Sequence, residues 1–169
     1  PIAAQPGTGA VLVLGGTRAT GLEVVKILRA RGDEVAVLAR PTSDASQAEA
    51  LGARIVRGDA MNPQDLAAIM ASGSYRAVVS TLGARSVDGP RPDFEGNRNA
   101  IDAARAAGIR RFVLVTVIGD GESLDAAPWI ARRILDSVIM EKSKAEDFLK
   151  ASGLDFTIIR PGGLLEKDA

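Results

Sequence analysis

Six short hydrophobic runs recur along the chain at a spacing typical of alternating strands and helices. Each run is rich in Val, Ile or Leu. Most are continuous rather than alternating, as expected of strands that are buried on both faces of a parallel sheet. The predicted strands are Val11–Leu14, Val35–Leu38, Arg54–Val56, Ala77–Ser80, Phe112–Val115 and Phe156–Ile159.

Helical segments are predicted between these runs, and their ends are marked by glycine or proline. Proline is tolerated in the first turn of a helix, and a glycine just past the last turn closes it. The predicted helices are Gly21–Arg31 before Gly32, Gln64–Ala71 after Pro63, Asp93–Ala107 before Gly108, and Pro128–Ala151 before Gly153.

This alternation predicts an α/β fold of Rossmann type. We expect a doubly wound parallel sheet in the order 3-2-1-4-5-6, with helices on both faces and right-handed crossovers. The 169 residues suffice for a single domain with its own core. Two predicted loops, Arg85–Pro92 and Gly119–Pro128, follow the fourth and fifth strands, so they lie at the carboxyl edge where such sheets bind ligands.

The composition argues against several classes of function. Basic and acidic residues are equal in number, 21 of each, and aromatic residues make up 4%, which disfavours nucleic acid or a membrane surface as a partner. The chain has no Cys and no His, which disfavours a metal site or a catalytic triad. Without a membrane-spanning run or a signal-peptide pattern, we expect a cytoplasmic protein. The sequence does not indicate an oligomeric state.

The most specific motif is the glycine turn Gly15–Gly21, which joins the first strand to the first helix. Gly15 lets the chain leave the strand abruptly, and Gly21 lets helix and strand pack closely. The helix N-terminus between them offers N–H groups and a partial positive charge to a pyrophosphate, and Thr17 and Thr20 can add hydroxyl donors. The motif predicts a bound dinucleotide. A tight turn without a ligand is the alternative.

The end of the second strand indicates which dinucleotide is bound. NAD-binding proteins usually place an acidic residue there, where it accepts a hydrogen bond from the ribose 2′-hydroxyl. Here Ala39 and Arg40 follow the strand, and no carboxylate precedes Asp44. The planar guanidinium of arginine suits phosphate oxygens, so Arg40, with Arg18 as a second cation, predicts NADP(H) in preference to NAD(H). Alternatively, Arg40 is a solvent-exposed residue at the end of the strand with no role in binding.

Together these motifs resemble the atypical short-chain dehydrogenase/reductases, the branch that includes NmrA-like proteins and biliverdin reductase B. The glycine turn of the family is matched by Gly15–Gly21, except that its central glycine is Arg18. The other similar phrases, in chain order, are Arg40, Gly58-Asp59, Ser80–Arg85, Glu95–Val113, Lys142–Glu146 and Ser152–Leu164. The resemblance therefore extends over nearly the whole chain.

The resemblance implies a set of cofactor contacts and catalytic roles for Lys142 and Thr116. The implied contacts are Gly15, Thr17, Arg18, Ala19, Thr20, Gly21, Arg40, Ser43, Asp59, Ala60, Thr81, Leu82, Gly83, Arg85, Thr116, Lys142 and Pro161. Two of these residues have a second interpretation. Lys142 could pair with Glu146 one turn along the helix, and Asp59 could form the turn ahead of the Pro63 helix.

The catalytic tyrosine of the typical branch is missing. That tyrosine acts as general acid four residues before the lysine, but here Val138 precedes Lys142 and Met140 precedes Lys144. The only tyrosine, Tyr75, precedes the predicted fourth strand. The side chains at the expected position therefore cannot transfer a proton.

These observations predict an NADPH-dependent reductase of a flavin, quinone or similar acceptor, because hydride transfer to a delocalised ring needs no positioned acid. The alternative is a non-catalytic NADP(H) sensor or scaffold of NmrA-like type, and an epimerase is disfavoured. Thr116 supplies the substrate-orienting hydroxyl in one alignment, whereas Val117 occupies that position in another. We expect residues 1–169 to form one domain that lacks part of the substrate-covering segment of the family, or to be part of a longer chain.

Overall fold

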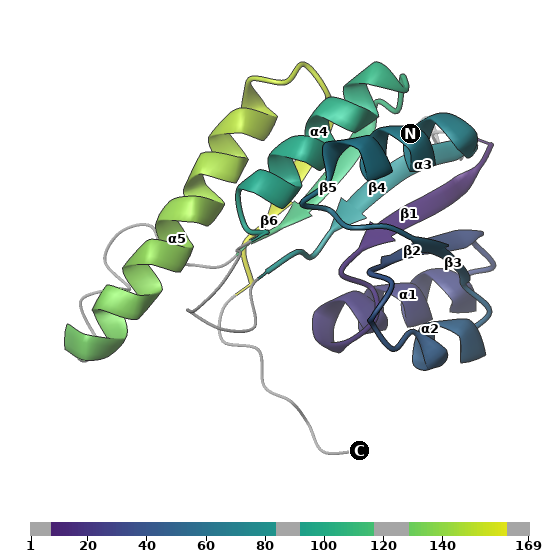
Figure 1. Cartoon of the computed structure of the whole chain (residues 1–169), viewed down its shortest axis with the longest axis horizontal. Helices are drawn as coiled ribbons and strands as arrows, with labels where there is room; N and C mark the ends of the chain where they lie inside the picture. The colour runs from purple at the N-terminus through teal and green to yellow at the C-terminus, as the bar shows by residue number, and fades with distance from the viewer. Residues whose placement is uncertain (1–7, 84–91, 117–128, 162–169) are drawn as a thin grey trace, which may run out of the picture.

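The computed structural model describes residues 8–83, 92–116 and 129–161 (Figure 1). Its strands are β1 (Ala10–Leu14), β2 (Val35–Ala39), β3 (Arg54–Arg57), β4 (Tyr75–Ser80), β5 (Arg111–Val115) and β6 (Asp155–Ile159). Its helices are α1 (Ala19–Ala30), α2 (Ser46–Ala50), α3 (Pro63–Ser72), α4 (Glu95–Ala106) and α5 (Trp129–Lys150).

All neighbouring strands pair in parallel, in the order β3-β2-β1-β4-β5-β6. The predicted Rossmann-type fold and strand order are therefore confirmed. The chain moves outward from β1 to β3, then returns to the other side of β1 to form β4. In a doubly wound sheet this reversal opens a crevice at the carboxyl ends of the two central strands.

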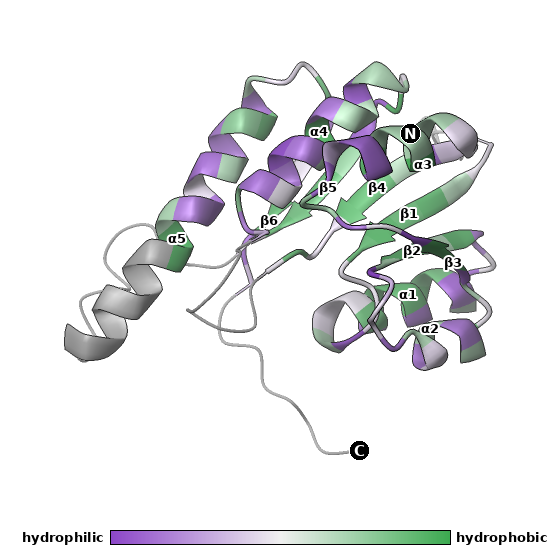
Figure 2. Cartoon of the chain, viewed as in Figure 1, coloured by the Kyte–Doolittle hydropathy of each residue, from purple (hydrophilic) through white to green (hydrophobic). Residues whose placement is uncertain are grey.

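Helices cover both faces of the sheet, with α1 and α2 on one face and α3, α4 and α5 on the other (Figure 1). Alternate residues of β1 pack into two separate hydrophobic cores. Val11 and Val13 pack in the cluster on the α1 face, whereas Leu12 and Leu14 pack in the cluster on the α3–α5 face. Figure 2 shows the hydrophobic strands at the centre of the molecule and mixed hydrophobic and polar residues along α4 and α5.

Burial on both faces holds for the central strands but not for the outer ones. Every residue of β1 and β2 is buried. By contrast, β5 is exposed or half-buried at alternate positions, and no residue of β6 is fully buried. No residue of β3, the strand at the other edge, is fully buried either. The sequence interpretation was therefore right for the centre of the sheet and too broad for both of its edge strands.

The structure adds one helix that the sequence analysis missed, shifts the starts of two others by two residues, and shifts the starts of the remaining two by one. The five residues of α2 are too few to show a helical period. Helix α1 begins at Ala19 rather than Gly21, and α4 begins at Glu95 rather than Asp93. Within the described ranges, none of the helices is long and hydrophobic enough to cross a membrane.

Candidate cofactor-binding site

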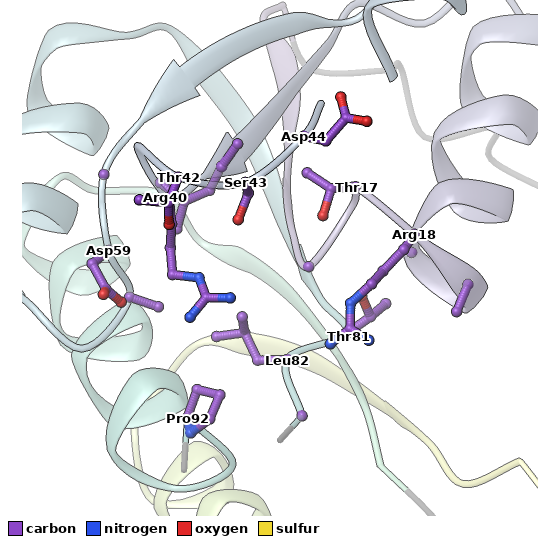
Figure 3. Close-up of a pocket in the computed structure, with 18 of the residues that line it drawn as sticks. Thr17, Arg18, Arg40, Thr42, Ser43, Asp44, Asp59, Thr81, Leu82 and Pro92 are labelled. Carbon is purple, nitrogen blue, oxygen red and sulfur yellow. The ribbon is translucent and has the colours of Figure 1, made fainter. Parts of the chain in front are cut away.

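A cavity of about 870 Å³ opens at the carboxyl ends of β1, β2, β3 and β4 (Figure 3). It lies where the strand order reverses, as the doubly wound topology requires. The predicted cofactor residues that line it are Gly15, Thr17, Arg18, Ala19, Thr20, Gly21, Arg40, Ser43, Asp59, Ala60, Thr81, Leu82 and Gly83. Thr116, Lys142 and Pro161 are not among the lining residues, and Arg85 lies outside the described residues.

The glycine turn forms one wall of the cavity because β1 and α1 approach each other very closely. A Cβ atom on Gly21 would lie 2.2 Å from the backbone oxygen of Gly15. Gly15 has a φ of +81°, a conformation that side chains disfavour. A Cβ atom there would meet the Thr81 hydroxyl at 2.7 Å. Neither position can hold a side chain without moving backbone, so the turn brings bare main chain to the cavity.

Arg18 is compatible with the turn even though the family places a glycine there. Its φ of −164° is extended backbone, which any residue can adopt. The left-handed conformation falls on the next residue, Ala19, at φ +44°. Among the described residues, no side chain caps the N-terminus of α1, and its first turn has no acidic residue. The partial positive charge of this helix end therefore faces the cavity.

The end of β2 forms a second wall through the turn of residues 40–43. The Ser43 N–H donates to the Arg40 carbonyl at 2.9 Å, which closes a four-residue turn. Figure 3 shows the guanidinium of Arg40 pointing into the cavity, with Arg18 on the opposite side. The carboxylate of Asp44 accepts from the Ser46 N–H at 2.9 Å. Hydrogen bonds from Ser46 and the charge of Arg57 lower the pKa of Asp44.

The loop after β3 forms the third wall, where Asp59 has a structural role besides lining the cavity. Its Oδ1 accepts from the Met61 N–H at 2.9 Å, and its own N–H donates to Asp65 Oδ2 at 2.8 Å. The second interpretation of Asp59, a turn ahead of α3, is therefore correct as a description of its contacts. The neighbouring Ala60 carbonyl accepts from Asn99 Nδ2 of α4 at 3.0 Å.

The loop after β4 is held to β1 on one side and to α4 on the other. The Thr81 hydroxyl donates to the Leu14 carbonyl at 3.0 Å. The buried Ser80 hydroxyl donates to Asn97 Oδ1 at 2.6 Å, and Asn97 Nδ2 donates to the Asp93 carbonyl at 2.7 Å. Asn97 thus connects the end of β4 to the start of α4, and it fixes the loop that leads to Leu82 and Gly83.

The ammonium of Lys142 reaches this loop from α5. Its Nζ lies 3.2 Å from Asp93 Oδ1 and donates to the Leu82 carbonyl at 3.3 Å. Only 12% of the Lys142 side chain and 1% of the Asp93 side chain are exposed. A Cβ atom on Gly83 would be 3.5 Å from Nζ, so the ammonium stands directly behind the cavity wall. The alternative in which Lys142 pairs with Glu146 is wrong.

Glu146 instead joins the carboxyl ends of β5 and β6. It accepts from the Thr116 hydroxyl at 2.8 Å and from Arg160 Nε at 3.0 Å, while Arg160 Nη2 makes a further ion pair with it. Burial raises the pKa of Glu146, but the hydrogen bonds from Arg160 and Thr116 and the charges of Arg160 and Lys150 lower it below its usual value. In this structure the predicted catalytic Thr116 is buried and directs its hydroxyl at a carboxylate.

No tyrosine lies near Lys142 among the described residues. Val138, one helical turn before it, is half-buried, and Met140 is 57% exposed. Tyr75 is the first residue of β4 and therefore lies at the amino end of the strand, whereas the cavity lies at the carboxyl ends. A general acid of the typical branch is therefore missing from this part of the chain.

Sequence reasoning missed the two asparagines that brace the cavity. Asn97 and Asn99 are buried in α4 beside Ala100 and Ile101. Their only signal was the presence of two poor helix formers among small residues on the buried face of a helix. Buried amides of this kind require hydrogen-bond partners, but the sequence does not say which.

The site and the fold agree with known proteins. Residues 15–169 match the NAD(P)H-binding family. The chain belongs to this family. A nicotinamide dinucleotide is therefore its cofactor, and the glycine cradle of the cavity fits the close approach of such a group. The resemblance to atypical short-chain dehydrogenase/reductases is confirmed, whereas the roles of individual residues stay predictions.

Three similar proteins illustrate the range of the family. An uncharacterised chloroplastic protein of Arabidopsis thaliana is 31% identical over 93% of this chain and 60% of its own length. The photosystem II assembly factor Ycf39 of Synechocystis is 31% identical over 92% of this chain and 45% of its own length. The structure of ChuY, an anaerobillin reductase from Escherichia coli O157:H7, has a TM-score of 0.77 at 30% identity and covers 92% of this chain and 74% of that chain. The chain thus spans about half the length of the curated relatives.

The close approach at Gly21 gives a direct test of the site. We expect Gly21→Ala to weaken the binding of both NADPH and NADH by about tenfold or more, because the added Cβ forces α1 away from the Gly15 carbonyl. Fluorescence titration measures the affinity, and circular dichroism checks that the sheet persists. As a control, Gly32→Ala adds a Cβ with nothing within 4 Å at a glycine that is not among the residues lining the cavity, and it should leave both affinities unchanged. Unchanged affinity in Gly21→Ala would contradict this account.

Proposed function

We propose that this chain is an NADP(H)-dependent reductase that transfers hydride to a flavin, a quinone or a similar delocalised acceptor. The observation that carries the proposal is the cavity itself. Its walls include a glycine turn at a helix N-terminus and the guanidinium of Arg40 at the end of β2, and the ammonium of Lys142 lies outside the lining, bonded to the Leu82 carbonyl of the β4 loop. These three features suit the pyrophosphate, the 2′-phosphate and the nicotinamide ribose respectively.

The preference for NADP(H) is supported by the charges at the end of β2. Arg40 points into the cavity (Figure 3), and the Thr42 and Ser43 residues beside it also line that wall. The carboxylate of Asp44 also lines this wall, and its Oδ1 accepts from the Ser46 N–H at the start of α2 at 2.9 Å. A guanidinium with adjacent hydroxyls favours a phosphate dianion, and the position directly after β2, where NAD-binding proteins usually place an acidic residue, holds Arg40.

The proposed chemistry assigns to Lys142 a binding role. An ammonium has three N–H donors. The Lys142 Nζ donates to the Leu82 carbonyl and forms an ion pair with Asp93 at 3.2 Å, and we propose that a remaining N–H donates to a ribose hydroxyl of the cofactor. A bound nicotinamide supplies the hydride. Because Val138 stands where the typical branch has its acid, the proton comes from water, and acceptors that delocalise the added electrons are favoured.

A second candidate is a non-catalytic NADP(H)-dependent scaffold. It is supported by the side chains at the tyrosine position, Val138 and Met140, and by the similarity to a protein named as an assembly factor. The two candidates share the cofactor and differ in turnover. NADPH oxidation measured against a panel of flavins, quinones and dicarbonyls separates them, because a scaffold would bind NADPH and oxidise it with none of these acceptors.

The cofactor preference depends on Arg40. We expect NADPH to bind at least about tenfold tighter than NADH, and Arg40→Ala to abolish most of this difference by weakening NADPH alone. Fluorescence titration with both cofactors measures the ratio. The matched control is Arg105→Ala, which removes the same charge from an exposed ion pair on α4. Equal affinities for NADPH and NADH in the wild-type protein would rule out the preference.

The acceptor class follows from the missing acid. We expect simple ketones to be reduced at least about 10²-fold more slowly than flavins, since a positioned general acid contributes 10²–10⁴-fold. Val138→Tyr places a phenol one turn before Lys142 and should raise ketone reduction. Met140→Tyr places it on an exposed part of the helix and should not. Rapid ketone turnover by the wild-type protein would show that another group supplies the proton.

The role of Lys142 is tested by separating binding from turnover. We expect Lys142→Ala to raise the Kd of NADPH about tenfold while kcat at saturation falls by less than about threefold. This change leaves the buried Asp93 carboxylate without its ion pair, so the double variant Lys142→Ala/Asp93→Asn is measured beside it. Lys144→Ala, at an exposed lysine that pairs with Glu141, serves as control. A loss confined to kcat would make Lys142 a catalytic group instead.

A further inference from the structure

An arginine of the neighbouring strand donates hydrogen bonds to the turn of residues 40–43. Arg57 is the last residue of β3 and stands opposite Ala39 of β2 in the parallel register. Its Nη1 donates to the Arg40 carbonyl at 3.1 Å and to the Ser43 carbonyl at 2.9 Å. One guanidinium nitrogen thus joins the first and last residues of the turn.

These contacts complete the hydrogen bonding of the turn. The Arg40 carbonyl already accepts from the Ser43 N–H at 2.9 Å, and Arg57 is its second donor. Pro41 occupies the position of a turn that favours a fixed φ. The turn is therefore closed from within by its own hydrogen bond and from outside by Arg57. Arg57 is exposed and is not among the residues that line the cavity.

From this geometry we infer that Arg57 is a positioning residue for the recognition of the 2′-phosphate. It holds the turn in the conformation that directs Arg40 into the cavity and keeps Thr42 and Ser43 at its rim. A turn that is ordered before binding does not lose conformational entropy when the cofactor enters. The inference rests on the proposed preference for NADP(H), and it adds a residue that has no contact with the cofactor cavity.

The effect of Arg57 should be specific to the phosphorylated cofactor. NADPH and NADH share the pyrophosphate and the adenine, and they differ only at the ribose 2′ position, which the turn would contact. We expect Arg57→Ala to weaken the binding of NADPH about tenfold and the binding of NADH by less than about twofold. The reason is that a hydrogen bond from a charged donor contributes more than one from a neutral donor. Fluorescence titration with NADPH and NADH measures both values.

A matched control on the same strand separates the turn contact from net charge. Arg54 is the first residue of β3, at the opposite end from the turn, and its guanidinium lies over the Tyr75 ring at 5.8 Å from the centroid. Arg54→Ala removes the same charge and should leave the NADPH/NADH ratio unchanged. Arg57→Lys keeps the charge on a shorter side chain that cannot reach both carbonyls, so its NADPH affinity should lie below that of the wild-type protein.

A measurement without cofactor tests the contact itself. The Ser43 amide, which donates within the turn, should exchange its hydrogen about tenfold faster in Arg57→Ala than in the wild-type protein, and no faster in Arg54→Ala. Nuclear magnetic resonance follows this exchange, and thermal unfolding confirms that both variants are folded. The inference would be supported if Arg57→Ala, and not Arg54→Ala, shows both faster exchange of the Ser43 amide and a lower ratio of NADPH affinity to NADH affinity.

Three outcomes would overturn it. They are equal loss of NADPH and NADH affinity in Arg57→Ala, equal losses of NADPH affinity in Arg54→Ala and Arg57→Ala, and unchanged Ser43 exchange. The proposed function fails in a different way. If the wild-type protein does not distinguish NADPH from NADH, the cofactor preference and the inference fall together. If the wild-type protein prefers NADPH and Arg57→Ala retains the same ratio, only the inference falls.

Discussion

The arrangement of this molecule depends on the contact between two backbones, where the start of α1 meets the end of β1. A single methyl group at Gly21 would come within 2.2 Å of the Gly15 carbonyl, so helix and strand are as close as main chains can be. This proximity turns the N-terminus of α1 toward the crevice made by the strand reversal. It also brings Thr81 of the β4 loop against the same turn, where its hydroxyl donates to Leu14. The close contact of α1 with β1 therefore sets the position of the cavity and places the partial positive charge of the α1 N-terminus at its wall.

The rest of the cavity is held by polar side chains rather than by the hydrophobic core, namely two buried asparagines and one exposed arginine. Asn99 holds the loop after β3, Asn97 holds the loop after β4, and Arg57 holds the turn after β2. Asn99 and Arg57 donate to carbonyls in loops, and Asn97 connects Ser80 at the end of β4 to the Asp93 carbonyl ahead of α4. Since a buried amide is costly to leave without partners, these side chains fix loop conformations that backbone pairing alone would leave variable. The hydrophobic clusters set the layers, and the polar braces set the shape of the site.

The sequence predicted the features that depend on local pattern. The continuous hydrophobic runs indicated the strands and their order, and the glycine turn indicated the cavity, because both signals lie within a few neighbouring residues. Features that depend on contacts between distant segments were missed or misjudged. The alternative interpretation of Lys142 paired it with Glu146, its neighbour on the helix, whereas it pairs with Asp93 from another segment. The five-residue α2 has no period to detect, and the bracing roles of Asn97 and Asn99 become visible only when the loops they contact are in place.

The link between Thr116, Glu146 and Arg160 gives the molecule an unequal response to acid. One carboxylate joins β5, β6 and α5, and its pKa is lowered in the folded protein. A group of this kind contributes stability that is fully present above its unfolded pKa and is lost as the pH falls through its folded pKa. Protonation of Glu146 would weaken the pairing with Arg160 and remove an acceptor for Thr116 at the same time. The contacts of the glycine turn are between carbonyls, amides and a hydroxyl and include no such titrating group, so acid weakens the link on the β6 side of the sheet while the glycine turn keeps its contacts.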